Sequence, residues 1–121
     1  MTKRDDLQYL HDIASYGQEA IDGCFGNSVK DFSKNRILYH AVIRLLQVVG
    51  EAAAHVSSET QAKLPAIPWK KIIGMRNILV HAYHGVDDAL IWNVIEDQLP
   101  KLVQAVREYL AVVAPGSPDS S

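Results

Sequence analysis

A chain of 121 residues with 48% hydrophobic side chains is long enough for one domain with a buried core and too short for two of ordinary size. Twelve basic against fourteen acidic residues give a net charge of -2, which excludes polyanion binding by bulk charge, so a nucleic-acid site must be a local patch. The lone Cys24 forms no intrachain disulfide, and no apolar leader follows the N-terminus, which favours a cytoplasmic location. No run approaches the roughly 18 apolar residues of a membrane span, so we expect a soluble protein.

The first predicted element is a helix over roughly residues 5–24, because apolar side chains recur there at helical spacing. Its row is Leu7, Leu10, Ala14, Gly17 and Ile21, flanked by Ile13, Ala20 and Cys24. Asp5 or Asp6 is placed to cap its start, and Gly23 and Gly26 can end it. A short helical connection is expected around residues 28–33.

A longer helix over residues 37–56 has apolar residues on two sides. One row comprises Leu38, Val42, Leu45, Val49, Ala52 and Val56, and the second comprises Ile37, Ala41 and Val48. A helix covered on two sides suits a bundle member that also meets a partner subunit, so we expect a homodimer.

After this helix, Ser58 and Gln61 have the spacing of a capping box for a brief turn, and Pro65 and Pro68 forbid a continuous helix.

The third main helix is predicted from Pro68 to about His84, with a stop at Gly85. Asp87 or Asp88 caps a last helix, in which Pro100 should cause a bend. Its inner row is Ile91, Ile95, Gln98, Leu102, Val106, Tyr109 and Val113. The sequence thus predicts an all-α, antiparallel four-helix-type bundle with short extra helical turns, as a single domain over residues 1–113, and a disordered tail over 114–121.

Positive charge is concentrated on the third helix and its approach. Residues 60–86 contain Lys63, Lys70, Lys71 and Arg76 with no acidic residue, together with Asn77, His81, Tyr83 and His84. This segment is either a solvated basic face or a site that holds an anion.

The geometry of a straight helix separates the chemically useful groups of this segment. Asn77, His81 and His84 fall within about 40° of one another, whereas Arg76 and His81 are about 140° apart. A two-fold dimer could bring an arginine and a histidine from each chain around one cleft. Histidine moves protons near neutral pH and arginine holds phosphate, a combination suited to phosphodiester cleavage, although a histidine near a helix end is often only a surface or capping residue.

Other kinds of site have little support in the sequence. His81 and His84 could be half of a metal site, but no third Cys, Asp or Glu ligand lies in their segment, so we expect no metal and no cofactor. No catalytic Ser or Cys system and no glycine-rich phosphate loop is present.

Several stretches together resemble the HepT-like proteins of the HEPN superfamily, over roughly residues 5–112. They are Ala41–Ala53, Ile67-Pro68-Trp69, Gly74–Tyr83 and Gly85-Val86-Asp87. The most specific part is an arginine and a histidine separated by four residues, with a tyrosine two residues on, here Arg76, His81 and Tyr83.

The resemblance implies a dimeric helical bundle that acts as a metal-independent endoribonuclease, the toxin of a toxin–antitoxin pair. In that family the arginine and histidine of the motif form the RNase site in the dimer cleft, which matches Arg76 and His81, and the polar residue after the arginine matches Asn77. The partner antitoxin is a minimal nucleotidyltransferase, and the tyrosine to which it transfers AMP matches Tyr83. Leu45 stands where relatives often carry asparagine, and Gln47 replaces a frequent glutamate.

The leading hypothesis assigns His81 as general acid or base, Arg76 as the group that stabilises the charged phosphorane, and Asn77 as an orienting residue. Lys70 and Lys71 would help to hold the RNA backbone. Two alternatives are a non-catalytic HEPN module that binds a nucleotide or its partner protein, and a purely structural helical dimer.

Overall fold

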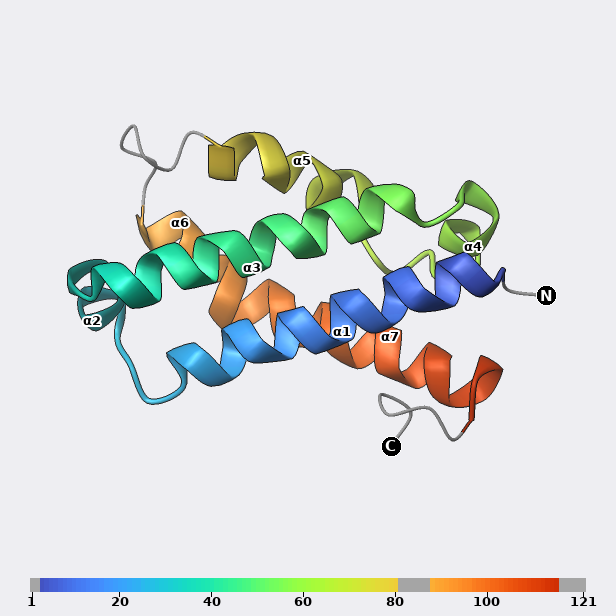
Figure 1. Cartoon of the computed structure of the whole chain (residues 1–121), viewed down its shortest axis with the longest axis horizontal. Coiled ribbons are helices and arrows are strands. Elements are labelled where there is room, and N and C mark those ends of the chain that lie inside the picture. Colours follow the sequence, from blue (N-terminus) through green and yellow to red (C-terminus); the bar gives the residue numbers. More distant parts are fainter. Residues whose placement is uncertain (1–2, 81–87, 116–121) are drawn as a thin grey trace.

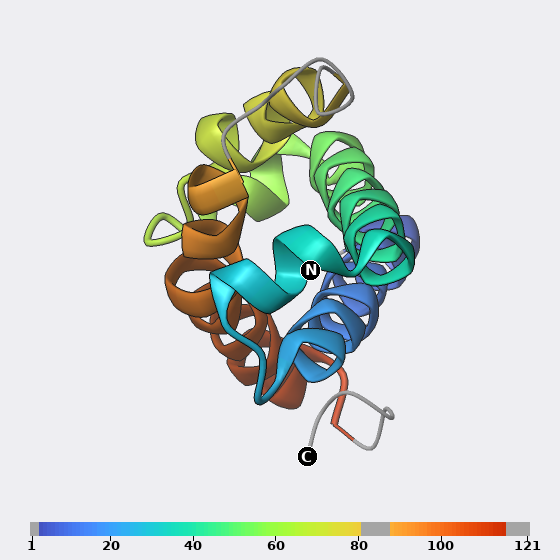
Figure 2. The ribbon, with the colours of Figure 1, turned by 90° about the vertical axis from the view of Figure 1, so that its left-hand side faces the viewer.

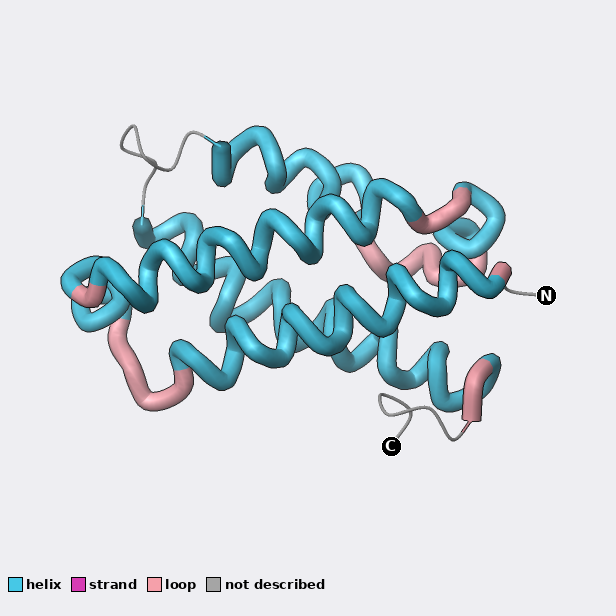
Figure 3. The backbone as a smooth tube through the Cα atoms, viewed as in Figure 1, coloured by secondary structure: helices cyan, strands magenta, loops and turns pink. Residues whose placement is uncertain are grey.

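The computed structural model describes residues 3–80 and 88–115, apart from the side chains of Ile78 and Val80, and every regular element in them is helical (Figure 3). In chain order these are α1 (Arg4–Cys24), α2 (Val29–Lys34), α3 (Arg36–His55), α4 (Ser58–Ala62), α5 (Trp69–Val80), α6 (Asp88–Asn93), a π-helical turn (Val94–Gln98) and α7 (Leu99–Val113). The predicted all-α class is confirmed.

The long helices run in alternating directions (Figure 1). Helix α1 packs against both α3 and α7, and α3 also packs against α5. Seen from the end in Figure 2, the long helices form a ring, and the short helix α2 lies across the end that faces the viewer. The predicted antiparallel bundle with short extra helices is therefore present, and α5 lies at its periphery, supported mainly by α3.

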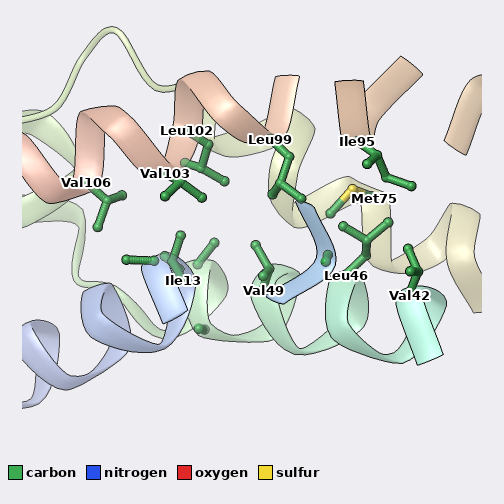
Figure 4. Close-up of a cluster of buried hydrophobic side chains, with 14 of the residues drawn as sticks. Ile13, Val42, Leu46, Val49, Met75, Ile95, Leu99, Leu102, Val103 and Val106 are labelled. Carbon is green, nitrogen blue, oxygen red and sulfur yellow. The ribbon is translucent and has the colours of Figure 1, made fainter. Parts of the chain in front are cut away.

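The core is built mainly of aliphatic side chains from the facing sides of these helices, part of which Figure 4 shows, together with a few buried aromatic ones. Ile13 of α1, Val49 of α3 and Val106 of α7 are among its least exposed members. Burial of such apolar surface, at about 25 cal/mol per Å², is the main force that holds the helices together. In α1, most of the predicted inward positions from Leu10 to Cys24 are buried, whereas Leu7 and Ile21 are half-buried.

Helix α3 uses only one of its two predicted apolar rows inside the chain. Ile37 is 85% exposed, Ala41 is exposed and Val48 is half-buried. In the first row, Leu38 and Leu45 are half-buried and the rest are buried, namely Val42, Val49, Ala52 and Val56. By length and composition alone, α3 could also cross a membrane, but it packs between α1 and α5 as a core helix does.

Two predicted helix caps are wrong, and two of the residues concerned, Asp6 and Ser57, are hydrogen-bonded to each other. Helix α1 begins after Lys3 without a side-chain cap, and α4 is capped by Ser57, one residue before the predicted Ser58. The carboxylate of Asp6 accepts hydrogen bonds from the Ser57 N–H at 3.0 Å, the Ser57 hydroxyl at 2.5 Å and the Thr60 hydroxyl at 2.6 Å. Asp6 therefore joins α1 to α4 and is not available as a cap for its own helix.

The predicted bend at Pro100 takes the form of the π-helical turn before α7. The Leu99 N–H bonds to the carbonyl of Val94, five residues back, which widens the helix where proline removes a donor. Ile91, Ile95, Leu102 and Val106 of the predicted inward row are buried. The predicted Gln98, Tyr109 and Val113 are only half-buried or exposed, because the extra residue in the turn changes the phase of the helix. Leu99, Val103 and Leu110 are buried in their place.

Candidate functional site

Helix α5 carries the described part of the predicted site. Lys70, Lys71, Arg76 and Asn77 all lie on it. The predicted His81 and Tyr83, the neighbouring His84 and the predicted stop at Gly85 lie outside the described residues.

The start of α5 is fixed by Trp69. Its side chain is buried, and its indole N–H donates to the carbonyl oxygens of Gln61 and Leu64, each at 3.1 Å. The carbonyl of Pro68 accepts from the N–H of Lys71 and of Ile72, so the helix begins directly after the proline, close to the predicted start. These bonds tie the first turn of α5 to the α4 region and set where the following residues point.

Arg76 lies where α5 meets α3, and its side chain is half-buried. Its Nε–H donates to the carbonyl of Ile73 at 3.4 Å, and its aliphatic stem passes over Gly50 of α3. Within residues 3–80 and 88–115 Arg76 has no ion pair and no further hydrogen bond. The terminal guanidinium nitrogens are therefore uncommitted there, and such a group can bind phosphate through two parallel hydrogen bonds.

The other predicted residues occupy different sides of α5. Asn77 and Lys70 are exposed and seven positions apart, which places them on one face, about 20° apart. This face is about 100° round the helix from Arg76. Lys71 is also exposed and lies about 140° round the helix from Arg76, in the other direction from Lys70. The two lysines therefore do not lie together beside the guanidinium.

Lys71 instead borders an apolar pocket between α5 and the α6–α7 segment. The pocket has a volume of about 290 Å³, and its walls include Leu46, Met75, Leu79 and Leu102. At its mouth Lys101 forms an ion pair with Asp97 at 3.1 Å. With so few polar groups in its walls, this pocket is suited to apolar contacts and not to phosphate.

Leu45 and Gln47, the two departures noted from the family resemblance in the sequence, differ in their relation to Arg76. Leu45 packs against the core and is about 140° round α3 from Gly50, so it faces away from the arginine. Gln47 is half-buried and about 60° from Gly50, one turn before it, and so lies on the Arg76 side.

Sequence reasoning missed Gly50 as a residue of this site. Its signal is a glycine inside an apolar helix, where glycine is usually unfavourable by roughly 0.5–1 kcal/mol relative to alanine.

No group of three or more His, Cys, Asp or Glu side chains that could hold a metal ion occurs among the described residues.

Comparison with known proteins identifies the family. Residues 7–109 match the family model described as Ribonuclease HepT-like. The chain belongs to the HepT-like ribonuclease family. The match spans α1 to α7 and includes Arg76 and every other predicted site residue.

Relatives of this HepT-like chain are found in archaea and bacteria. A candidate RNase of Methanocaldococcus jannaschii is 35% identical over 106 residues, which cover 88% of this chain and 97% of the relative. A candidate RNase of Caldanaerobacter subterraneus is 37% identical, with 84% and 91% covered. A Thermococcus cleftensis protein named probable ribonuclease HepT is 35% identical, with 83% and 91% covered. No solved structure matches the chain.

Proposed function

We propose that this HepT-like protein is a metal-independent endoribonuclease whose site is built around Arg76 and His81. The observation that carries the proposal is the state of Arg76, which is held at its stem and at Nε while its terminal nitrogens have no partner among the described residues. An arginine fixed in this way is preorganised to receive the phosphate of an RNA backbone.

The reaction needs one group that moves protons and one that stabilises negative charge. In the proposed mechanism, His81 takes the proton of a ribose 2′-hydroxyl and the 2′-oxygen bonds to phosphorus. The bond from phosphorus to the 5′-oxygen breaks, this oxygen takes a proton from water, and the protonated His81 returns its proton to the solvent. Arg76 stabilises the charged phosphorane, and Asn77 orients the phosphate or the histidine. The products are a 2′,3′-cyclic phosphate and a 5′-hydroxyl.

The lysines have a secondary place in this proposal. Both Lys70 and Lys71 are exposed near the start of α5, where they can contact RNA phosphates through water-accessible ammonium groups. Lys70 shares its face with Asn77 and is the closer of the two in angle to Arg76. Their substitution should weaken RNA binding and its salt dependence more than the chemical step.

We further propose that the active form is a homodimer with a composite cleft. The exposed Ile37 and the exposed Ala41 leave one apolar row of α3 uncovered in the single chain, which favours a partner subunit. The wide angle between Arg76 and His81 on a straight helix favours a site completed by two chains.

The proposed biological role is that of a toxin controlled by a minimal nucleotidyltransferase antitoxin. Transfer of AMP from ATP to the Tyr83 hydroxyl, with release of pyrophosphate and the hydroxyl proton, would place a bulky anion seven residues after Arg76, which in a continuous helix is about two turns on and on nearly the same side. The anion could pair with Arg76 and block the entry of substrate phosphate, so modification would switch cleavage off.

The deciding experiment is cleavage of total RNA by the purified protein in excess EDTA. The wild type should cleave, and Arg76→Ala and His81→Ala should each lower the rate by about 10²–10³-fold with an unchanged helical circular dichroism spectrum. Wild-type cleavage by a folded His81→Ala variant would remove this residue from the mechanism. A wild type that binds RNA without cleaving it would favour the non-catalytic module.

A further inference from the structure

Gly50 of α3 lies directly beneath the side chain of Arg76. A β-carbon at Gly50 would lie 2.7 Å from Arg76 Cγ, 3.6 Å from Arg76 Cδ and 3.3 Å from the backbone carbonyl oxygen of Ile72. Carbon atoms in van der Waals contact are normally about 3.5–4.0 Å apart. A side chain at position 50 therefore cannot coexist with the present position of Arg76.

The contact falls at the part of Arg76 that sets the direction of the whole side chain. Cγ is close to the backbone, so a displacement there moves Cδ, Nε and the guanidinium together. The Nε–H bond to the Ile73 carbonyl, at 3.4 Å, also holds this side chain. The Ile72 carbonyl oxygen, at 3.3 Å, is a second tight contact, so bending the arginine stem alone would leave the new β-carbon pressed against the backbone of α5.

We propose that Gly50 is a positioning residue for Arg76: its missing side chain lets α5 approach α3 and seats the arginine stem so that the guanidinium projects from the helix contact. This inference rests on the proposed ribonuclease function, in which Arg76 must meet phosphate. A misplacement of about 1 Å at a reacting group can cost about 10²-fold in rate.

The test compares three glycine-to-alanine variants in the full-length protein. Gly50→Ala should lower kcat per folded molecule by about 10–100-fold. Gly17→Ala creates an equally close contact, 2.7 Å from Val103 Cγ2, but between α1 and α7, so it should lower stability and leave kcat unchanged. Gly74→Ala is exposed on α5 with no atom within 4 Å, so it should cleave as the wild type does.

The pH profile separates displacement of Arg76 from general distortion of α5. Arginine remains protonated throughout the usual range, so loss of its contact should lower the rate equally at each pH. Gly50→Ala should therefore keep the shape of the wild-type pH–rate profile. A shifted profile would mean that the proton-transferring group has moved, and it would overturn the assignment to Arg76.

A double-mutant cycle tests the contact without relying on cleavage. In Arg76→Ala the Cγ atom is absent, so adding Gly50→Ala should lower the urea midpoint of unfolding much less than it does in the wild type. If Gly50→Ala alone does not fold, the double variant should fold. Equal losses in both backgrounds, or failure of both variants to fold, would overturn the proposal.

The cleavage outcomes distinguish the two proposals. If the wild type cleaves RNA and Gly50→Ala cleaves equally well per folded molecule, the positioning role is wrong and the ribonuclease proposal stands. If the wild type does not cleave, the ribonuclease proposal fails, and the unfolding cycle still decides whether Gly50 seats Arg76.

Discussion

The hydrogen-bonded carboxylate of Asp6 offers a direct test of how the bundle holds its α4 end. We expect Asp6→Ala to destabilise the protein strongly although it removes no apolar packing. The side chain is only 3% exposed, and its oxygens accept bonds from the Ser57 N–H, the Ser57 hydroxyl and the Thr60 hydroxyl. Thr60 is also buried, so its hydroxyl would lose a partner away from bulk water.

The size of the loss follows from these contacts. A hydrogen bond to a charged group contributes about 1.5–3 kcal/mol, and three bonds to one carboxylate are not additive, so we expect a loss of about 3 kcal/mol. For a domain of this size such a loss lowers Tm by roughly 10 °C. The matched control is Asp5→Ala, which removes the same charge from the same helical turn at an exposed position. It should cost about 0.3–1 kcal/mol.

The same carboxylate gives the stability a defined pH dependence. Burial by itself raises the pKa of Asp6, but the hydrogen bonds from Ser57 and Thr60 outweigh it and lower the pKa below its ordinary value of 3.8. The stabilisation is therefore fully present above the pKa of the unfolded chain and is lost as the pH falls through the lower pKa of the folded state. The difference between wild type and Asp6→Ala should be constant above about pH 5 and shrink in stronger acid.

Urea unfolding followed by circular dichroism, at several pH values, measures both effects. Equal stability of Asp6→Ala and Asp5→Ala at neutral pH would refute the assignment of Asp6 as the link between α1 and α4. A difference that grew in acid would refute the sign of the pKa shift.

Three further predictions concern assembly, regulation and the lone thiol. Sedimentation at micromolar concentration should give about twice the chain mass of 13.4 kDa, and a clean monomer would remove the composite cleft. Tyr83→Phe should keep RNase activity but gain no AMP mass when co-expressed with the cognate nucleotidyltransferase; equal modification and silencing of this variant would move the switch to another residue. Burial raises the pKa of the Cys24 thiol to about 11, so iodoacetamide at about pH 8 should label it slowly in the folded protein and rapidly in denaturant. Rapid native labelling would contradict its burial.

Much of this fold is determined locally and could be predicted from the sequence. Apolar periodicity locates α1 and α3 to within one or two residues, because a helix buries whatever stripe its spacing creates. Pro68 marks the start of α5, and Gly26, with φ of 80°, ends the first helical segment in a conformation that favours glycine. The motif itself, Arg76 with His81 and Tyr83, is also a property of the sequence.

Tertiary structure decided the features that depend on residues distant in the chain. Asp6 looked like a helix cap because local spacing cannot reveal that Ser57 and Thr60, more than fifty positions away, lie beside it. The π-helical turn before Pro100 changes which residues of this segment face inward, and ideal helical periodicity cannot anticipate such a turn. Leu99 is buried in place of Gln98, although Leu102 and Val106 are buried as predicted. From the sequence, Gly50 is only a glycine in an apolar helix, and its contact with Arg76 becomes visible only when α5 is packed against α3. A side chain at position 50 would clash with Arg76 only because α3 and α5 approach closely there. The distance between two helices is set by how their side chains pack, and the spacing of residues along one helix does not reveal it.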